Sequence, residues 1–402
     1  MSKEKIKLAF IGYGQRGPAL LKSLAEMPDV EIVAVCDKYE DRTRQMIHDV
    51  KEAGGCTPYA VQDYREIIAN LTLDAAVVCT SWSMHIPITV AFMEAGVAVG
   101  FEVGGCDSIE QCWELVRTHR KTGVHCMMLE NCCYGKREMM LLNMAEQGFF
   151  GEIVHVEGSY THFLAGQILA GKEKRHYRLA NYLHRNCDNY PTHAFGPLCK
   201  LLGINHGNRL VSLTSTASKA VGLKSYMRDN EIENKDLINE RFMQGDVVTT
   251  TIKCAYGETI TLKLDTTLPA FGSRTLAVAG TRARFDERTC SFFELGKDDP
   301  EGLWRSNWGN EREYEEQYMH PLWKQYEKEG VQLGHGGMDW LVLRAFVESV
   351  KSGTRPPIDA YDAATWMSIT PLSEMSIAMG GMPVEIPDFT YGQWIEENVK
   401  GD

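Results

Sequence analysis

A glycine-rich turn near the start of the chain constrains its fold more than any other feature. The apolar segment Ile6–Ile11 leads directly into Gly12, Gly14 and Gly17, which have the spacing G-x-G-x-x-G, and the amphipathic stretch Gln15–Met27 follows. Such glycines permit a tight turn and a close approach of the backbone to a pyrophosphate, whose charge the N-terminus of the next helix favours. The sequence therefore predicts a dinucleotide-binding site. The alternative is a doubly wound domain whose glycine loop is coincidental.

Short apolar runs alternate with amphipathic stretches through the first third of the chain. The candidate strands are Ile6–Ile11, Glu31–Cys36, Ala75–Cys79, Val97–Phe101 and Cys126–Leu129, and the candidate helices are Gln15–Met27, Arg42–Ala53, Pro87–Ala95 and Ile109–Thr122. Strands that are almost continuously apolar indicate a parallel sheet covered on both faces. We expect an N-terminal Rossmann domain, a doubly wound parallel sheet, over residues 1–132, with the helix Lys136–Gln147 leading into a second domain.

The pattern changes after Gly151. Further strands are expected at 153–162, Arg209–Thr216, Val247–Cys254, Thr259–Leu264 and Thr275–Ala279, with a hairpin turn at Tyr256–Glu258, a surface loop at Gly296–Asn310, and helices at Asp339–Lys351 and Ala363–Met379, the latter kinked at Pro371. Because these strands have one polar face, they predict a mostly antiparallel sheet. We therefore expect an α/β protein whose second, α+β domain spans residues 133–402. The helix near 363–379 is expected to pack back on the first domain.

Composition restricts the partners. With 402 residues, two domains are the natural expectation, and the formal net charge of −12 argues against nucleic acid or an anionic membrane. No apolar run is long enough to span a membrane, and residues 1–5 show no signal peptide, so a cytoplasmic protein is expected unless a signal has been removed. Small polar ligands remain, and an exposed sheet face on the second domain makes a homo-oligomer a further option.

The cysteines do not indicate a metal site. The 12 cysteines are scattered and form no C-x-x-C pair. We expect reduced, mostly buried thiols and no structural zinc.

Polar side chains follow several of the predicted parallel strands. Asp37 closes the second strand about 20 residues after the glycines, the spacing of a ribose-binding carboxylate, which would repel a 2′-phosphate and favours NAD over NADP. Trp82 and His85 follow the third predicted strand, and Glu102 and Asn131 follow the next two. All reach the same sheet edge, so we expect them to line the cofactor. The alternatives are packing for Trp82 and solvated or capping roles for Glu102 and Asn131.

Candidate substrate residues lie in the second domain. Tyr160 and His162 are two apart on a strand and point to one face, which lines a substrate pocket or faces solvent. The segments Arg175–Arg178 and Tyr190–His193 add aromatic, arginine and histidine side chains that suit a neutral, hydroxyl-rich ligand. His193 precedes a helix expected to begin near Pro197 and can exchange a proton near neutral pH. Its alternative is a helix cap or a hydrogen-bonded core group.

These residues resemble a known group. The two-domain layout, the glycine loop and the segment around Glu102 are similar to the Gfo/Idh/MocA sugar oxidoreductases, in which a Glu-Lys-Pro lysine handles the proton that accompanies hydride transfer. Here Val103 and Gly104 replace the lysine and proline. Finer motifs resemble the NAD-dependent glycosidases of glycoside hydrolase family 109: Trp82–His85, Glu102-Val103, Glu130–Gly135, Tyr190–His193, Gly334–Asp339, Pro371–Glu374 and Pro387–Thr390.

The resemblance implies a set of site residues. It implies cofactor contacts at Gln15, Arg16, Asp37, Trp82, His85, Glu102, Val103 and Asn131, and sugar contacts at Tyr160, Arg178, Tyr190, Thr192 and His193, with His162 beside them. One departure is visible. The family places a substrate-side tyrosine before a Ser-Arg pair, where this chain has Phe271-Gly272 before Ser273. N-acetylgalactosamine specificity and a broader set of hexopyranosides of either anomer are therefore both open.

The resemblance also implies a mechanism. The sugar C3 hydroxyl is oxidised by NAD, the acidified C2 proton is removed, the aglycone leaves C1 by elimination, water adds, and C3 is reduced again. His193 is expected to assist at the C3 hydroxyl, and Tyr160 to transfer a proton at C2 or at the leaving group, with a cation nearby to lower its pKa. Arg178 and Tyr190 would position the sugar. The main alternative is a plain NAD-dependent sugar dehydrogenase, and a non-catalytic sugar or NAD sensor is a third.

Overall fold

The computed structural model describes residues 5–232, 237–299, 301, 308–330 and 335–395. The chain folds into two compact units. Unit 1 comprises residues 1–135 and 329–365, and unit 2 comprises residues 136–328 and 366–402. A single boundary at residue 132 cannot describe this division, because the chain returns to unit 1 near its end. Residues 1–4, on which the expectation about a signal peptide rests, and part of the predicted loop 296–310 lie outside the described residues.

Unit 1 is built on a six-stranded sheet in the order β3-β2-β1-β4-β5-β6, in which every pairing is parallel. Its strands are β1 (Ile6–Ile11), β2 (Val30–Cys36), β3 (Tyr59–Val61), β4 (Ala75–Val78), β5 (Ala98–Phe101) and β6 (Cys126–Met128). Its helices are α1 (Gly17–Ala25), α2 (Glu40–Glu52), α3 (Tyr64–Asn70), α4 (Trp82–Glu94), α5 (Ile109–Thr122), η1 (Asn131–Tyr134), η3 (His335–Gly337) and α13 (Met338–Ser352). The predicted doubly wound parallel sheet is confirmed.

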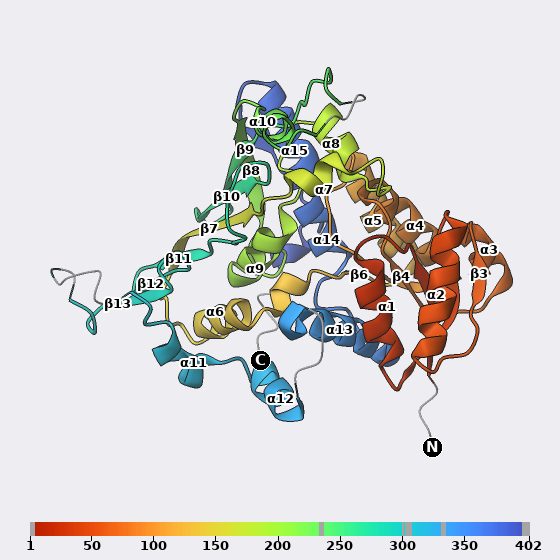
Figure 1. The fold of residues 1–402 in the computed structure, drawn as a ribbon. Helices are drawn as coiled ribbons and strands as arrows, with labels where there is room; N and C mark the ends of the chain where they lie inside the picture. The colour runs from red at the N-terminus through yellow and green to blue at the C-terminus, as the bar shows by residue number, and fades with distance from the viewer. Residues whose placement is uncertain (1–4, 233–236, 300, 302–307, 331–334, 396–402) are drawn as a thin grey trace. The chain divides into compact units, whose positions relative to one another are not determined.

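The strand order explains where ligands can bind in unit 1. Leu8, Phe10 and Phe101 are fully buried in the sheet, α1 packs beside α2, and α4 packs beside α5 (Figure 1). The order reverses between β1 and β4, and a crevice forms outside the carboxyl ends of the strands at such a reversal. The glycine loop follows β1 at that edge.

In unit 1 the sequence analysis missed two elements and placed the start of one helix wrongly. The strand β3 and the helix α3 were not predicted, because β3 has only three residues and its Tyr59 is exposed. The helix α4 begins at Trp82 rather than near Pro87, so Trp82 and His85 lie in its first turn instead of in a loop. Pro87 is tolerated because it is close to the helix N-terminus.

Unit 2 is built on an eight-stranded sheet in the order β13-β12-β11-β7-β10-β9-β8-β14. Its strands are β7 (Ile153–Thr161), β8 (Leu210–Ala217), β9 (Val247–Cys254), β10 (Thr259–Asp265), β11 (Ala277–Gly280), β12 (Ala283–Asp286), β13 (Ser291–Glu294) and β14 (Val384–Glu385). Its helices are α6 (Lys136–Glu146), α7 (Ala165–Leu169), α8 (Arg178–His184), α9 (Thr192–Leu201), α10 (Gly222–Asp229), α11 (Arg312–Tyr318), α12 (Pro321–Glu329) and α15 (Ile369–Ala378), while α14 (Ala360–Met367) connects the two units along the chain.

The unit 2 sheet is mostly antiparallel, as predicted, with one parallel pairing between β7 and β10. The predicted hairpin turn joins β9 to β10, where Gly257 adopts φ +101. Buried and exposed residues alternate along β9, so one face of this strand is packed and the other is not. The predicted helix 363–379 is two helices, because the helix is interrupted at Ser368. Pro371 lies in the first turn of the second helix, α15.

Close packing of α9 on β7 helps to position His193 and Tyr160, two of the candidate catalytic residues. A Cβ atom at Gly158 of β7 would lie 2.8 Å from the Cβ of Ala194 in α9, so only glycine permits this approach. Ala194 follows His193, and Tyr160 lies two residues after Gly158. The helix begins at Thr192 rather than near Pro197, and Pro197 lies inside it.

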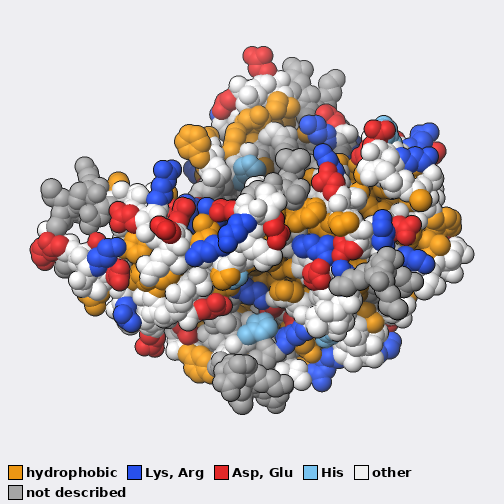
Figure 2. All heavy atoms as spheres, turned by 90° about the horizontal axis from the view of Figure 1, so that it is seen from below, with side chains coloured by type: hydrophobic (Ala, Val, Ile, Leu, Met, Phe, Trp, Pro, Cys, Tyr) orange, Lys and Arg blue, Asp and Glu red, His pale blue; other side chains and the backbone are white. Residues whose placement is uncertain are grey.

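The surface of the described residues shows mixed charge. On the face seen in Figure 2, acidic and basic side chains are interspersed. Among the helices of the described part of the chain, none combines the length and apolar character needed to cross a membrane.

Candidate active site

The three glycines of the turn after β1 differ in how much space their surroundings leave for a side chain. Gly12 adopts φ +94, and a Cβ there would lie 2.6 Å from the carbonyl oxygen of Cys79. A Cβ at Gly17 would lie 3.0 Å from the carbonyl oxygen of Gly12. A Cβ at Gly14 would meet no described atom within 4 Å. Gly12 is therefore required by the fold itself and a side chain at Gly17 would be crowded, whereas the open space over Gly14 suits a group that approaches from outside.

Asp37 lies at the end of β2 beside this loop and is buried. Its Oδ2 accepts the backbone N–H of Tyr13 at 2.7 Å, and its Oδ1 accepts the N–H of Tyr39 at 2.9 Å. The Arg42 guanidinium is 3.8 Å from Oδ2. A carboxylate has about four acceptor positions, so these bonds fix the group and leave capacity for hydroxyl donors. Gln15 is exposed on the neighbouring loop.

A network of charged groups, here called the carboxyl-edge network, joins the ends of several strands of unit 1. Its members are Arg16, Glu102, Asn131, His335 and Asp339. Arg16 Nη2 is 3.2 Å from Glu102 and 2.9 Å from Asp339, whose carboxylate also lies 2.8 Å from His335 Nδ1. Burial opposes ionisation of Asp339, but the hydrogen bonds from His335 and Arg16 and the Arg16 charge hold its pKa well below its ordinary value.

The substitution Asp339→Asn tests how much this network contributes to the free energy of unfolding. Asp339 is 0% exposed, and its loss as an anion leaves the Arg16 charge without one of its buried partners. We expect a decrease of about 3–5 kcal/mol in the free energy of unfolding, the range for breaking a buried ion pair. Because the pKa of Asp339 is lowered on folding, its contribution is full above its unfolded pKa and is lost as the pH falls below about 4. Denaturant titrations at pH 7 and pH 3 measure this, and an equal effect at both would contradict it.

His85 and Asn131 present buried acceptor atoms at the same edge. Burial lowers the pKa of His85 to about 4, although its bond to Thr80 opposes this, so the ring is neutral at pH 7. His85 Nε2 lies 3.2 Å from the carbonyl oxygen of Thr80 and must donate to it, which leaves Nδ1 as an acceptor. Asn131 Nδ2 donates to Asp339 at 2.7 Å, which leaves its buried Oδ1 as an acceptor. Within the described residues, neither His85 Nδ1 nor Asn131 Oδ1 has a hydrogen-bond partner.

Val103 occupies the position of the missing lysine, in closely packed surroundings. Val103 is buried and its N–H donates to the carboxylate of Glu102 at 3.0 Å. A Cβ at Gly104 would lie 2.1 Å from Cδ1 of Trp82, so the indole ring lies directly against the Gly104 backbone. Glycine at 104 and tryptophan at 82 therefore depend on each other. Val103 offers no group that could exchange a proton.

The residues of unit 1 fit a nicotinamide dinucleotide. The open side of Gly14 and the N-terminus of α1 suit a pyrophosphate, and Asp37 suits ribose hydroxyls. The buried acceptors of His85 and Asn131 suit hydroxyl or amide donors, which the ribose and carboxamide groups of NAD provide. These residues follow β1, β2, β4 and β6 in the chain, so they belong to the carboxyl-end side of the parallel sheet, as predicted.

Unit 2 contains a compact aromatic cluster, which we define as Tyr160, His162, Arg178, Tyr190 and His193. The ring centroids of Tyr160 and Tyr190 are 4.5 Å apart, and Tyr160 is 5.7 Å from His193. The buried Arg178 guanidinium lies 4.9 Å from the Tyr190 ring. Burial opposes the charge of Arg178, but Tyr177, Tyr160, Tyr190 and Tyr182 hold its pKa above its ordinary value. The residues predicted from separate sequence segments thus lie together.

Hydrogen bonds link the members that can exchange protons. The Tyr190 hydroxyl is 3.2 Å from His193 Nε2, and the Tyr160 hydroxyl is 3.5 Å from His162 Nδ1. Partial burial, the Arg178 charge and His193 lower the pKa of His162. Thr192 is fully buried at the start of α9, where its hydroxyl has no partner in the described part of the chain. The cluster is therefore a set of proton carriers around a fixed cation.

A buried polar scaffold holds the turn that carries Tyr190 and His193. The N–H of Asp188 donates to Ser373 Oγ at 2.8 Å, and its carbonyl accepts from Thr370 Oγ1 at 2.9 Å. Gln244 Nε2 donates to the carbonyl of Cys187 at 2.9 Å. The Asp188 carboxyl accepts from Thr250 at 3.5 Å and from the backbone of Tyr190. Burial raises the pKa of Asp188 to about 7, against those two hydrogen bonds.

The substitution Asp188→Asn should flatten the pH dependence of stability. Between the ordinary Asp pKa and about 7, the folded protein holds a proton that the unfolded chain has lost, so the unfolding free energy falls as the pH rises. This one group predicts a loss of about 3 kcal/mol between pH 5 and pH 8. The amide of the variant keeps an acceptor for the Tyr190 N–H and does not ionise. Denaturant unfolding at both pH values measures the difference, and an equal pH slope in both proteins would refute the prediction.

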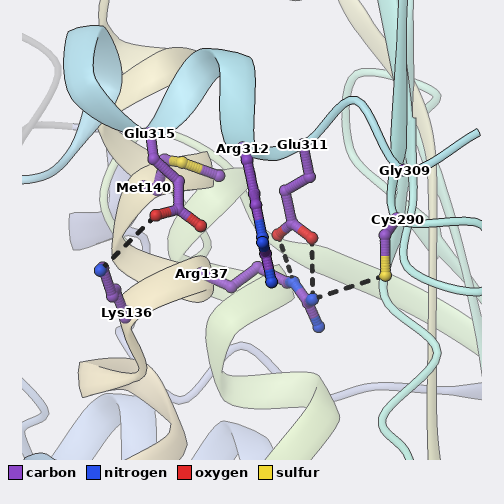
Figure 3. Close-up of a pocket in the computed structure, with 8 residues that line it drawn as sticks. All are labelled: Lys136, Arg137, Met140, Cys290, Gly309, Glu311, Arg312 and Glu315. Atoms are coloured by element: carbon purple, nitrogen blue, oxygen red, sulfur yellow. Dashed lines mark hydrogen bonds and ion pairs between the residues drawn. The ribbon is translucent and has the colours of Figure 1, made fainter. Parts of the chain in front are cut away.

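A separate pocket in unit 2 contains none of the predicted site residues. It has a volume of about 540 Å³ and is lined by Lys136, Arg137, Met140, Cys290, Gly309, Glu311, Arg312 and Glu315 (Figure 3). Arg137 donates to both carboxylate oxygens of Glu311, at 2.6 and 2.9 Å, and also to Glu287. Lys136 lies 3.0 Å from Glu327. These ion pairs tie α6 to α11 and α12, a structural role.

Three residues of these networks were missed from the sequence. Asp339 and His335 lie in a segment whose resemblance was noted without a role, and its Gly334 lies outside the described residues. An acid at the start of a helix is typical of an ordinary N-terminal turn, so its distant partners gave no signal. Nothing in the sequence distinguished Asp188.

Two family models match the chain. Residues 134–396 match "Glycosyl hydrolase 109, C-terminal domain", and residues 6–130 match "Oxidoreductase family, NAD-binding Rossmann fold". Together they cover almost the whole chain, and the second identifies the cofactor of unit 1 as NAD.

Known proteins are similar over most of their length. A glycosyl hydrolase family 109 protein of Stenotrophomonas maltophilia is 37% identical over 97% of this chain and 90% of its own. An α-N-acetylgalactosaminidase of Tannerella forsythia is 33% identical over 97% of this chain and 87% of its own. Among solved structures, an inositol dehydrogenase homolog with NAD⁺ from Azotobacter vinelandii has a TM-score of 0.69 and 19% identity, covering 95% of this chain and 97% of that one. At that identity the likeness shows the fold.

Proposed function

Because the chain belongs to glycosyl hydrolase family 109, we propose that it cleaves glycosides with NAD as a cofactor that is used and restored within each turnover. The substrate is a small hexopyranoside. The net reaction is hydrolysis, so no oxidised sugar is released.

One observation carries this proposal. The Tyr190 hydroxyl lies 3.2 Å from His193 Nε2, inside a cluster that also holds Tyr160 and the buried cation Arg178. Val103 occupies the place where related dehydrogenases carry a lysine. The acid–base groups available for sugar chemistry are therefore those of the cluster. Two kinds of proton transfer need two groups, and the cluster supplies both.

The residues have separate proposed tasks. Bound NAD supplies the acceptor, and later the donor, of the hydride at C3. His193 takes the proton of the C3 hydroxyl and gives it back at the end, since histidine exchanges protons near neutral pH. Once C3 is a ketone, the C2 proton is acidic, and Tyr160 removes it or protonates the departing oxygen at C1. Arg178 and Tyr190 orient the ring, and the Tyr190 hydroxyl holds the imidazole of His193 in place.

The sugar itself is less constrained. Relatives include proteins named α-N-acetylgalactosaminidase, from Tannerella forsythia and Bacteroides fragilis. This chain has Phe271-Gly272 where the family carries a tyrosine on the substrate side. We propose that N-acetylgalactosaminides lie within a broader set of hexopyranosides. Elimination does not depend on one face of the ring, so both anomers are expected.

A panel of α- and β-linked nitrophenyl glycosides, assayed with and without NAD, tests the function. We expect cleavage of both anomers, lost when NAD is stripped and restored when it is added. Displacement mechanisms are committed to one stereochemical course, so cleavage of both anomers supports elimination. NADH accumulating in proportion to the product would indicate a sugar dehydrogenase instead. Bound NAD without turnover on any glycoside would indicate a sensor.

A further inference from the structure

The loop after β10 carries an exposed aromatic ring one residue before Gly272, which borders His162 of the aromatic cluster. Phe271 is 96% exposed, an extreme value for so large an apolar side chain. Exposing this ring to water costs hydrophobic free energy, which contact with another apolar surface would recover.

The chain holds this loop firmly on both sides of Phe271. The N–H of Leu164 donates to the carbonyl of Thr266 at 2.9 Å, which fixes the start of the loop. Ser273 and Thr161 exchange backbone hydrogen bonds of 2.9 and 3.1 Å, which fix its end. Arg274 Nε donates to the buried Glu138 at 2.7 Å, and Pro269 limits the backbone between them. The exposed ring is therefore presented by an anchored segment.

Gly272 leaves open space beside His162. Apart from its chain neighbours Phe271 and Ser273, a Cβ at 272 would meet only the His162 ring, at 3.9 Å, among the described atoms. Gly272 does not adopt a left-handed φ, so its conformation does not demand glycine. The gap thus follows from the residue type at this position, and a larger side chain would close it.

The proposed roles of His193 and Tyr160 suggest which part of the substrate occupies the space beside His162. His193 handles C3 and Tyr160 handles C2 or the departing oxygen at C1, and the Tyr160 hydroxyl reaches His162 at 3.5 Å. Gly272 lies next to His162, since a Cβ there would be 3.9 Å from the His162 ring, and Phe271 precedes Gly272 in the chain. The group bonded to C1 beyond the sugar is the leaving group. On the basis of the proposed function, we propose that His162, Gly272 and Phe271 form a leaving-group subsite. It binds the flat apolar face of a ring, either an aryl group or the C–H face of a second pyranose.

The test compares leaving groups on one sugar of one anomer. NAD-loaded wild type and Phe271→Ala are assayed with the 4-nitrophenyl glycoside, the methyl glycoside and a disaccharide. Each variant is compared with wild type on the same substrate, so differences in leaving-group chemistry cancel. We expect kcat/KM to fall about 3- to 10-fold for the ring-bearing leaving groups, the effect of one lost aromatic contact, and to stay unchanged for methyl. Whether the aryl glycoside, the disaccharide or both respond identifies the ring.

Two further variants make the result specific. Phe271→Trp should preserve the preference for a ring, and Gly272→Leu should remove it by filling the gap. Phe293→Ala, which removes a 37% exposed phenylalanine on β13, is the matched control and should change nothing. Equal losses on the methyl and ring-bearing substrates, or no loss on any, would overturn the subsite.

The outcome can be separated from failure of the proposed function. A wild type that cleaves no glycoside, or cleaves without NAD, would refute the function. In that case calorimetric binding of the nitrophenyl glycoside to the NAD-loaded protein still tests the subsite. Weaker binding to Phe271→Ala than to wild type would support it, and equal binding would end it.

Discussion

Replacing His193 with alanine is expected to lower kcat for glycoside cleavage at least ~10²-fold, the usual contribution of a general acid–base group. The histidine lies in the first turn of α9, and its Nε2 bonds the Tyr190 hydroxyl at 3.2 Å. Its removal takes away the proposed acceptor of the C3 hydroxyl proton and changes no residue of unit 1. We therefore expect the Kd of NAD, measured by calorimetry, to match that of wild type.

His184→Ala is the matched control for this variant. His184 is exposed in the last turn of α8, in the same unit, and has no assigned role. It should retain the wild-type rate. If His193→Ala also cleaved at a near-normal rate, His193 would not be the acid–base group and the proton path would have to begin elsewhere.

Placing valine at Gly14 is expected to weaken NAD binding by roughly 2.7 kcal/mol or more, which is ~10²-fold in Kd. Gly14 faces open space and does not adopt a left-handed φ, so the side chain harms neither the backbone nor the packing of unit 1. It would occupy the volume through which the pyrophosphate approaches the backbone. The melting temperature of the NAD-free protein should therefore stay unchanged while the affinity for NAD collapses.

Gly12→Ala is the informative contrast. Its Cβ would lie 2.6 Å from the carbonyl oxygen of Cys79, and its φ of +94 disfavours any side chain. We expect this variant to lose stability even without NAD. If Gly14→Val bound NAD normally, the pyrophosphate would not lie over Gly14 and the assignment of the cofactor site would be wrong.

The sequence predicted best those elements that carry a strong local pattern. The strands β1 and β2 and the helix α5 were recognised because continuous apolar runs and helical periodicity appear within a single segment. The sequence analysis was wrong where contacts with distant parts of the chain determine the local structure. The helix α9 begins at Thr192 and packs through Ala194 against Gly158 of β7, a contact that no local signal in the sequence reports.

The candidate site shows the same division. Gly14, Asp37 and His193 were chosen as candidates because their residue types and spacing match a known chemistry, and their roles stay predictions. Asp339 and Asp188 were not, since each acquires its importance from burial and from partners more than 50 residues away in the chain. The association of copies through the exposed sheet face stays a prediction.

The proposed mechanism requires that the sugar passes through a C3 ketone whose C2 proton is removed before water adds. Cleavage of a glycoside in heavy water, followed by NMR of the released sugar, tests it most directly. We expect deuterium at C2 of the product and none at C3, because C3 receives back the hydrogen it gave. Product that carries no deuterium at C2 would contradict it, since direct displacement at C1 leaves the C2 hydrogen untouched.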